Sequence, residues 1–96
     1  SRRGDVGELW ENFLVVERLK KQKYSNQFAN NYFWRTYSQQ EIDWVEDKDG
    51  QLNGYEFKWG KKSGKIPPSW KESYPKAVFD TINKDNYLDF ITYDLG

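Results

Sequence analysis

The 96-residue sequence contains neither cysteine nor histidine, and these two absences limit the chemistry that it can support. Without cysteine there are no disulfides and no thiolate metal sites. Without histidine there is no imidazole for binding a metal or for moving protons near neutral pH. Any chemistry must therefore use carboxylates, lysines or hydroxyls, and any metal would be a hard cation such as Mg²⁺.

Net charge and long apolar runs are also missing. Lys and Arg number 15 and so do Asp and Glu, so no overall positive field would draw the chain to nucleic acid or to an anionic membrane. No apolar run approaches the roughly 20 residues of a membrane span, and no charged start followed by an apolar core marks a secretory signal. We therefore expect a cytoplasmic protein with no membrane partner, and the start without methionine predicts a piece of a longer chain.

Positive charge is concentrated in one segment. Between residues 58 and 76 there are six lysines and a single glutamate. One interpretation is a phosphate-contacting rim that includes Lys61, Lys62 and Lys65, and the other is a solvated surface. Arg35 is a further candidate for phosphate binding, with an ion pair to Glu41 or Asp43 as the alternative.

Hydrophobic periodicity predicts one domain with the order α-β-β-β-α-β-α. The first helix, 6–23, should bury an apolar stripe made of Val6, Leu9, Trp10, Phe13, Leu14 and Val16. A short helix should begin with Ser69 as its cap. The predicted strands are 31–36, 41–46, 52–59 and 76–82, with a hairpin turn at 47–50 and a terminal helix within 83–91.

The stretch QLNGYEFKWG, residues 51–60, sets Glu56 and Lys58 two positions apart in a strand pattern, so both should project from one face. A Glu-x-Lys pair alone carries no weight, because a second one occurs at Glu46 and Lys48. That second pair is expected at the edge of a turn, outside a fixed ladder. Within the predicted hairpin, Asp43 falls opposite Glu56 to within a residue or two. Two carboxylates at such a short separation favour the binding of a divalent ion between them.

These residues resemble the motif of the PD-(D/E)xK nuclease-like superfamily. The helix GELWENFLVVERL is similar to the family helix and places Gly7, Glu11 and Leu19 at the family spacing, EIDWV supplies Asp43, and YEFKW supplies Glu56 and Lys58. More narrowly, nearly the whole chain resembles the C-terminal domain of unknown function of predicted bacterial and archaeal AAA+ ATPases. Gln39 departs from the glycine that such domains often carry before the aspartate strand.

The resemblance implies an α/β (α+β) restriction-endonuclease-like α-β-β-β-α-β core with a central mixed four-stranded sheet flanked by helices. It also implies a Mg²⁺ or Mn²⁺ site held by Asp43, Glu56 and the carbonyl of Phe57, and completed by Glu11, with Glu17 as a rival for that role. Lys58 would orient water or steady phosphate charge. The chain lacks a P-loop, so it should not bind ATP by that route, and the ATPase domain would be a partner in cis.

Three functions therefore stay open from the sequence. The first is a Mg²⁺-dependent phosphodiester hydrolase that acts on DNA. The second is a catalytically inactive accessory domain that binds nucleic acid or a protein and is controlled by the ATPase, which the neutral net charge favours. The third is a purely structural or oligomerising appendage, which predicts an exposed apolar patch.

Overall fold

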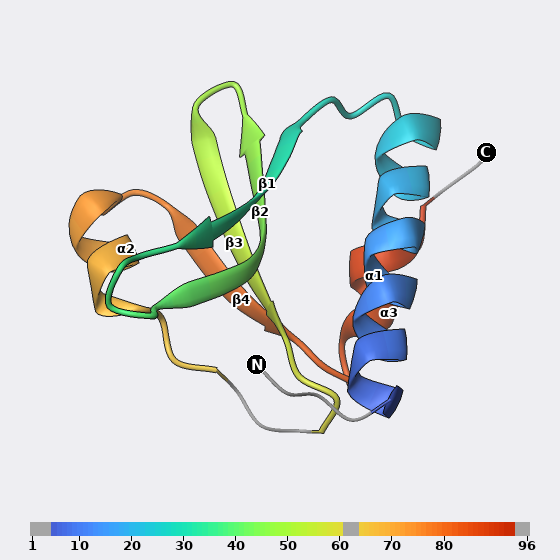
Figure 1. Ribbon diagram of the computed structural model, residues 1–96. Coiled ribbons are helices and arrows are strands. Elements are labelled where there is room, and N and C mark those ends of the chain that lie inside the picture. Colours follow the sequence, from blue (N-terminus) through green and yellow to red (C-terminus); the bar gives the residue numbers. More distant parts are fainter. Residues whose placement is uncertain (1–4, 61–63, 94–96) are drawn as a thin grey trace. The chain divides into compact units, whose positions relative to one another are not determined.

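The computed structural model describes residues 5–60 and 64–93. Helices and strands follow one another in the predicted order along these residues (Figure 1), which confirms the expected class of a sheet combined with helices. The elements are α1 (Asp5–Tyr24), β1 (Asn30–Arg35), β2 (Glu41–Lys48), β3 (Gln51–Phe57), α2 (Pro68–Ser73), β4 (Val78–Ile82) and α3 (Tyr87–Ile91).

The four strands form one sheet in the order β1-β2-β3-β4. β2 is antiparallel to both β1 and β3, whereas β4 runs in the direction of β3, so the sheet is mixed (Figure 1). The turn between β2 and β3 has positive φ at Asp49 (52°) and Gly50 (88°), as a two-residue hairpin turn requires. Asp47 Oδ1 accepts the Gly50 N–H at 2.9 Å. The hairpin predicted at 47–50 is therefore present.

β2 carries one extra residue relative to β1. The register of the two strands shifts midway along β1, and the extra residue falls at Asp43–Trp44. Because of this bulge, Ile42 and Val45 both reach the same core, although they are three positions apart. Strict alternation along the strand predicted at 41–46 would place Ile42 and Trp44 on one face and Val45 on the other, which is wrong because the pattern of polarity does not reveal a bulge.

The described residues form two compact units. The second unit, 29–56 and 64–81, has its core where Trp70 of α2 packs on Ile42 and Val45, all fully buried. Trp34 meets Trp70 edge-on, with ring centroids 5.4 Å apart. Around this core lie the partly buried side chains of Trp34, Leu52, Ile66, Ala77 and Phe79.

The N-cap residue of helix α2 provides no side-chain cap, and Ser69 does not have the capping role predicted for it. The N-cap residue is Pro67. Ser69 instead lies inside the helix, where its N–H donates to Gln40 Oε1 at 3.0 Å and its Oγ accepts from Gln40 Nε2 at 3.1 Å. A side chain from the β1–β2 connection therefore satisfies the first turn of α2, a contact that local sequence does not predict.

The first unit, 5–28, 57–60 and 82–93, is built on α1 packed beside α3. Arg18 is buried, and its Nη1 donates to the Phe90 carbonyl at 2.7 Å while the guanidinium lies 4.3 Å from the centre of the Phe90 ring. Lys21 Nζ donates to the Asp89 carbonyl at 2.8 Å. These carbonyls belong to the last turn of α3, where no partner exists within the helix, so α1 supplies the C-terminal cap of α3.

The buried face of α1 differs from the prediction. Trp10 and Leu14 are buried as expected, together with Arg18 and Gln22. The other members of the predicted stripe are exposed, namely Val6, Leu9, Phe13 and Val16. Arg18 occupies a buried position because it donates to a carbonyl of α3. A pattern of hydrophobicity does not predict such a contact.

No helix within the described residues is long and apolar enough to cross a membrane.

Gly54 is where the sheet and α2 approach each other most closely. A Cβ added at Gly54 would lie 3.2 Å from Trp70 and 3.3 Å from Ile42. We expect Gly54→Val to lower the free energy of unfolding by about 1–3 kcal/mol through overpacking. The control is Gly60→Val, because nothing lies within 4 Å of a Cβ at Gly60. Urea unfolding measures both, and equal midpoints would contradict this packing.

Candidate functional site

Asp43 and Glu56, the two predicted metal ligands of the second unit, adjoin the end of the β2–β3 ladder. The last ladder pair is Trp44 with Tyr55, and Asp43 and Glu56 are the next residues on their strands. Both are half-buried. Asp43 is also part of the bulge, a feature that re-aims side chains and occurs often beside active sites. Each of the two acidic residues therefore lies one position beyond the last ladder pair, at an irregular point of the sheet.

The Glu56 side chain contacts Gly64, in the segment that follows β3. Its carboxylate lies against Gly64 so closely that a Cβ at that position would overlap it. The Gly64 N–H donates to Thr81 Oγ1 at 2.9 Å, which anchors this glycine on β4. A side chain at residue 64 would displace the Glu56 carboxylate, so the glycine there leaves room for the position that this carboxylate takes.

Lys58 and Glu11 belong to the first unit. Lys58 lies one residue beyond the end of β3, so it is not inside the strand as the pattern predicted, and its N–H donates to the Ile82 carbonyl at 2.9 Å. Glu11, on α1, is half-buried with its Oε2 fully enclosed. Its rival Glu17 accepts a hydrogen bond from Lys20 at 3.1 Å. The role of Glu11 as a third ligand stays a prediction.

Among the described residues, no three acidic side chains gather closely enough to form a metal-binding group. This result limits the number of acidic ligands that a metal could have here. It does not change the preference of Mg²⁺ for carboxylate oxygens. Mg²⁺ is often held by one or two carboxylates and completes its shell with water, and carboxylate oxygens are the donors that it prefers. The pair of Asp43 and Glu56 fits such a site by its donors and by its place on neighbouring strands.

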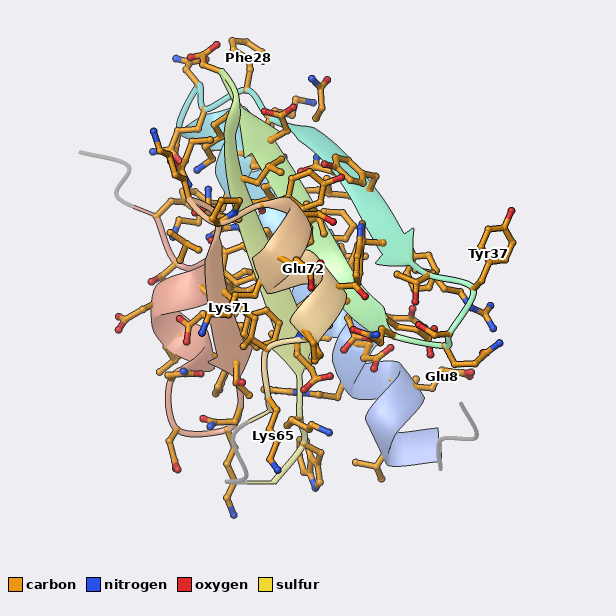
Figure 2. The ribbon with its side chains drawn as sticks, turned by 90° about the vertical axis from the view of Figure 1, so that its left-hand side faces the viewer. Glu8, Phe28, Tyr37, Lys65, Lys71 and Glu72 are labelled. Atoms are coloured by element: carbon orange, nitrogen blue, oxygen red, sulfur yellow. The ribbon has the colours of Figure 1, made fainter. Side chains whose placement is uncertain are left out.

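The predicted phosphate-binding residues are spread over separate places. Arg35 is exposed at the end of β1, and its Nη2 donates to Gln39 Oε1 at 2.7 Å, rather than to either acidic partner suggested by the sequence. Next to it, Tyr37 projects from the β1–β2 connection and is fully exposed (Figure 2). Lys65 is exposed, and Lys61 and Lys62 lie outside the described residues.

A cavity of about 510 Å³ lies beside the β2–β3 turn and not at the carboxylates. It is lined by the turn itself and by the segment between α2 and β4, with Asp49, Gln51, Tyr74 and Lys76 as its polar side chains. Gln51 Nε2 donates to the Lys76 carbonyl at 3.3 Å across it. Asp43 and Glu56 do not line this cavity.

The second Glu-x-Lys pair adjoins the turn as expected, but the prediction that it lies outside a fixed ladder was wrong. Glu46 and Lys48 lie within β2, and the ladder pairs them with Asn53 and Gln51 of β3. Glu46 is fully buried, accepts the Trp44 Nε1–H at 2.9 Å and lies 3.9 Å from Lys48 Nζ. Its neighbours on both adjoining strands are asparagines, a pattern that could have indicated a buried polar row from sequence.

Comparison with known proteins gives one match. A family model described as a domain of unknown function (DUF4143) matches residues 6–86, which include Glu11, Asp43, Glu56 and Lys58. No curated protein and no solved structure matches the chain significantly.

The burial of Glu46 predicts a large cost for its removal. Glu46→Ala should lower the free energy of unfolding by about 2–4 kcal/mol, because it leaves a void and removes the acceptor of the Trp44 indole. Glu46→Gln keeps an acceptor oxygen and should cost less. The control is Glu72→Ala, at an exposed position on α2 (Figure 2), with a change within about 0.5 kcal/mol. Thermal unfolding checks all three, and a loss for alanine no larger than for the control would exclude this role.

Proposed function

The chain belongs to the family described as a domain of unknown function (DUF4143), and from that premise we propose that it is a Mg²⁺-dependent phosphodiester hydrolase module. The observation that supports the proposal is the position of Asp43 and Glu56. Each lies one residue beyond the last pair of the β2–β3 ladder, and Asp43 lies in the bulge. Carboxylates placed side by side repel one another unless a cation or a proton offsets their charge.

Asp43 and Glu56 would hold the cation. A hard divalent ion bound there supplies Lewis-acid stabilisation of the negative charge that builds on a phosphate during hydrolysis. The protein's own contribution is orientation. The bulge fixes Asp43 on β2, and the glycine at residue 64 leaves room for the position that the Glu56 carboxylate takes. Placement of this kind lets the two acids meet a cation without reorganising first.

The substrate and the partners form part of the same proposal. DNA is the substrate class implied by the resemblance to PD-(D/E)xK nucleases, and an AAA+ ATPase domain in cis would deliver it. Balanced total charge predicts weak autonomous binding to DNA, so such delivery would matter. Lys58, with Arg35 and Lys65 as accessory cations, remains the group predicted to pair with phosphate.

The decisive experiment compares two aspartates of β2 and its turn. Asp43→Asn should reduce Mg²⁺- or Mn²⁺-dependent cleavage of labelled DNA by about 10²–10³-fold and weaken Mn²⁺ binding. Asp49→Asn is the matched control, since Asp49 is exposed in the turn and asparagine also accepts its positive φ of 52°. Equal cleavage by the two variants, or cleavage that is unaffected by chelation of metal, would reject the proposal.

A second candidate is an accessory domain that binds its partner without turnover. The observation that favours it is the lack of a third acidic side chain at Asp43 and Glu56 among the described residues. The same experiment separates the two functions. Binding of DNA that is equal for wild type and Asp43→Asn, with no cleavage by either at saturating Mn²⁺, would support the accessory function.

A further inference from the structure

Helix α1 exposes a row of large apolar side chains. Val6, Leu9, Phe13 and Val16 are 54%, 67%, 42% and 49% exposed. Their spacings of three, four and three residues place them within an arc of about 80° on the helix surface, at 3.6 residues per turn. We call these four residues the α1 stripe. Exposed apolar rows of this length on a soluble domain mark interaction sites.

The α1 stripe borders the side on which the helix packs in its own unit. The buried residues Trp10, Leu14 and Arg18 occupy the adjoining arc of the helix surface. At the boundary, Phe13 also contacts Tyr87 of α3, with ring centroids 6.3 Å apart. Spacings that alternate between three and four are those of a coiled-coil seam, in which each apolar side chain inserts between residues of a facing helix. The geometry of the stripe therefore suits another α-helix.

The charges of α1 indicate which helix would fit. The first half of α1 carries Glu8, which extends beside its first turns (Figure 2), and the last turns carry Lys20 and Lys23, all exposed. Lys20 Nζ also donates to Glu17 Oε2 of its own helix at 3.1 Å, which raises the pKa of Lys20. A helix of the same sequence running antiparallel sets acidic against basic residues at both ends and also opposes the two helix dipoles. A parallel copy would set like charges together.

We propose that the α1 stripe is the docking surface for a second copy of this chain, packed antiparallel about a two-fold axis between Phe13 and Val16. At the axis, Phe13 of each copy meets Val16 of the other. Further out, Leu9 lies against the aliphatic stem of Lys20 of the other copy, whose ammonium reaches Glu8. Two-fold symmetry makes each of these contacts twice.

The first test uses two valines that are equally exposed. Val16 is 49% exposed on the stripe, and Val78 is 50% exposed on β4. In sedimentation equilibrium, the wild-type chain should dimerise, and Val16→Lys should raise the dissociation constant of the dimer about a hundredfold, because two apolar contacts are lost per dimer. Val78→Lys should leave the constant unchanged. Circular dichroism checks that both variants keep the native helix content.

The second test exchanges charges between the halves of α1. One variant carries Glu8→Lys, and the other carries Lys20→Glu with Lys23→Glu. Each variant alone should dimerise at least about tenfold more weakly, since like charges then face each other, and an equimolar mixture should regain the wild-type affinity as a heterodimer. If the helices paired in parallel, like charges would face each other in the wild type and in each variant alone, so neither variant alone would dimerise more weakly than the wild type. If the substitutions only disturb the fold, the mixture regains no affinity.

Three outcomes would overturn the inference. They are a wild-type chain that stays monomeric up to about 1 mM, equal dissociation constants for the Val16 and Val78 variants, and a mixture that associates no better than its components. A monomer would assign the stripe to a different occupant, such as an ATPase domain in cis. None of these variants touches Asp43 or Glu56, so the result is independent of the hydrolase proposal.

Discussion

The extra residue in β2 is the constraint on which the second unit depends. A strand without a bulge would turn Ile42 and Val45 to opposite faces, and only one of them could reach Trp70. With the bulge at Asp43–Trp44, both side chains are fully buried in one core. A fully buried Val or Ile contributes about 1.5–3 kcal/mol, so the added burial outweighs the ladder hydrogen bonds lost at the bulge, about 0.5–1.5 kcal/mol each.

The bulge also gives two acidic residues of the same strand different environments. Glu46, beyond the bulge, is fully buried with a charged and an indole donor beside it. Asp43, inside the bulge, is half-buried where the ladder to β3 ends. A buried carboxylate that is hydrogen-bonded on several sides is costly to move, whereas one at an irregular point of a sheet can adapt to a ligand. This difference supports a structural role for Glu46 and agrees with the ligand role proposed for Asp43.

The sequence predicts those parts of the fold that local patterns determine. The order of elements and the hairpin turn at 47–50 follow from periodicity and from residues that accept positive φ, such as Asp49 and Gly50. The bulge does not follow, because its benefit is the burial of Val45 against Trp70, 25 positions away in the chain. The buried face of α1 does not follow from local patterns either, since Arg18 donates a hydrogen bond to a carbonyl 72 positions away. Long-range contacts decide both features.

The same limit applies to the candidate site. The pairing of Trp44 with Tyr55, one residue short of Asp43 and Glu56, could be predicted to within a residue or two, since it needs only the turn and the register that the turn sets. The position of the Glu56 carboxylate could not, because it depends on Gly64 and Thr81, which join it only when β4 is in place. A motif read along the chain thus identifies the acids, whereas their orientation is a property of the folded sheet.

Helix α1 combines two roles on separate surfaces. Glu11 is seven positions before Arg18, which places both on the side that packs beside α3, and Phe13 lies about 200° around the helix from Glu11. A partner on the α1 stripe would therefore not cover the Glu11 side. The rotation of α1 against α3 is set by the Arg18 bond to the Phe90 carbonyl together with the ring contacts of Trp10 and Phe13 with Tyr87. The exposure of Val6, Leu9 and Val16 is thus a consequence of how α1 packs on α3.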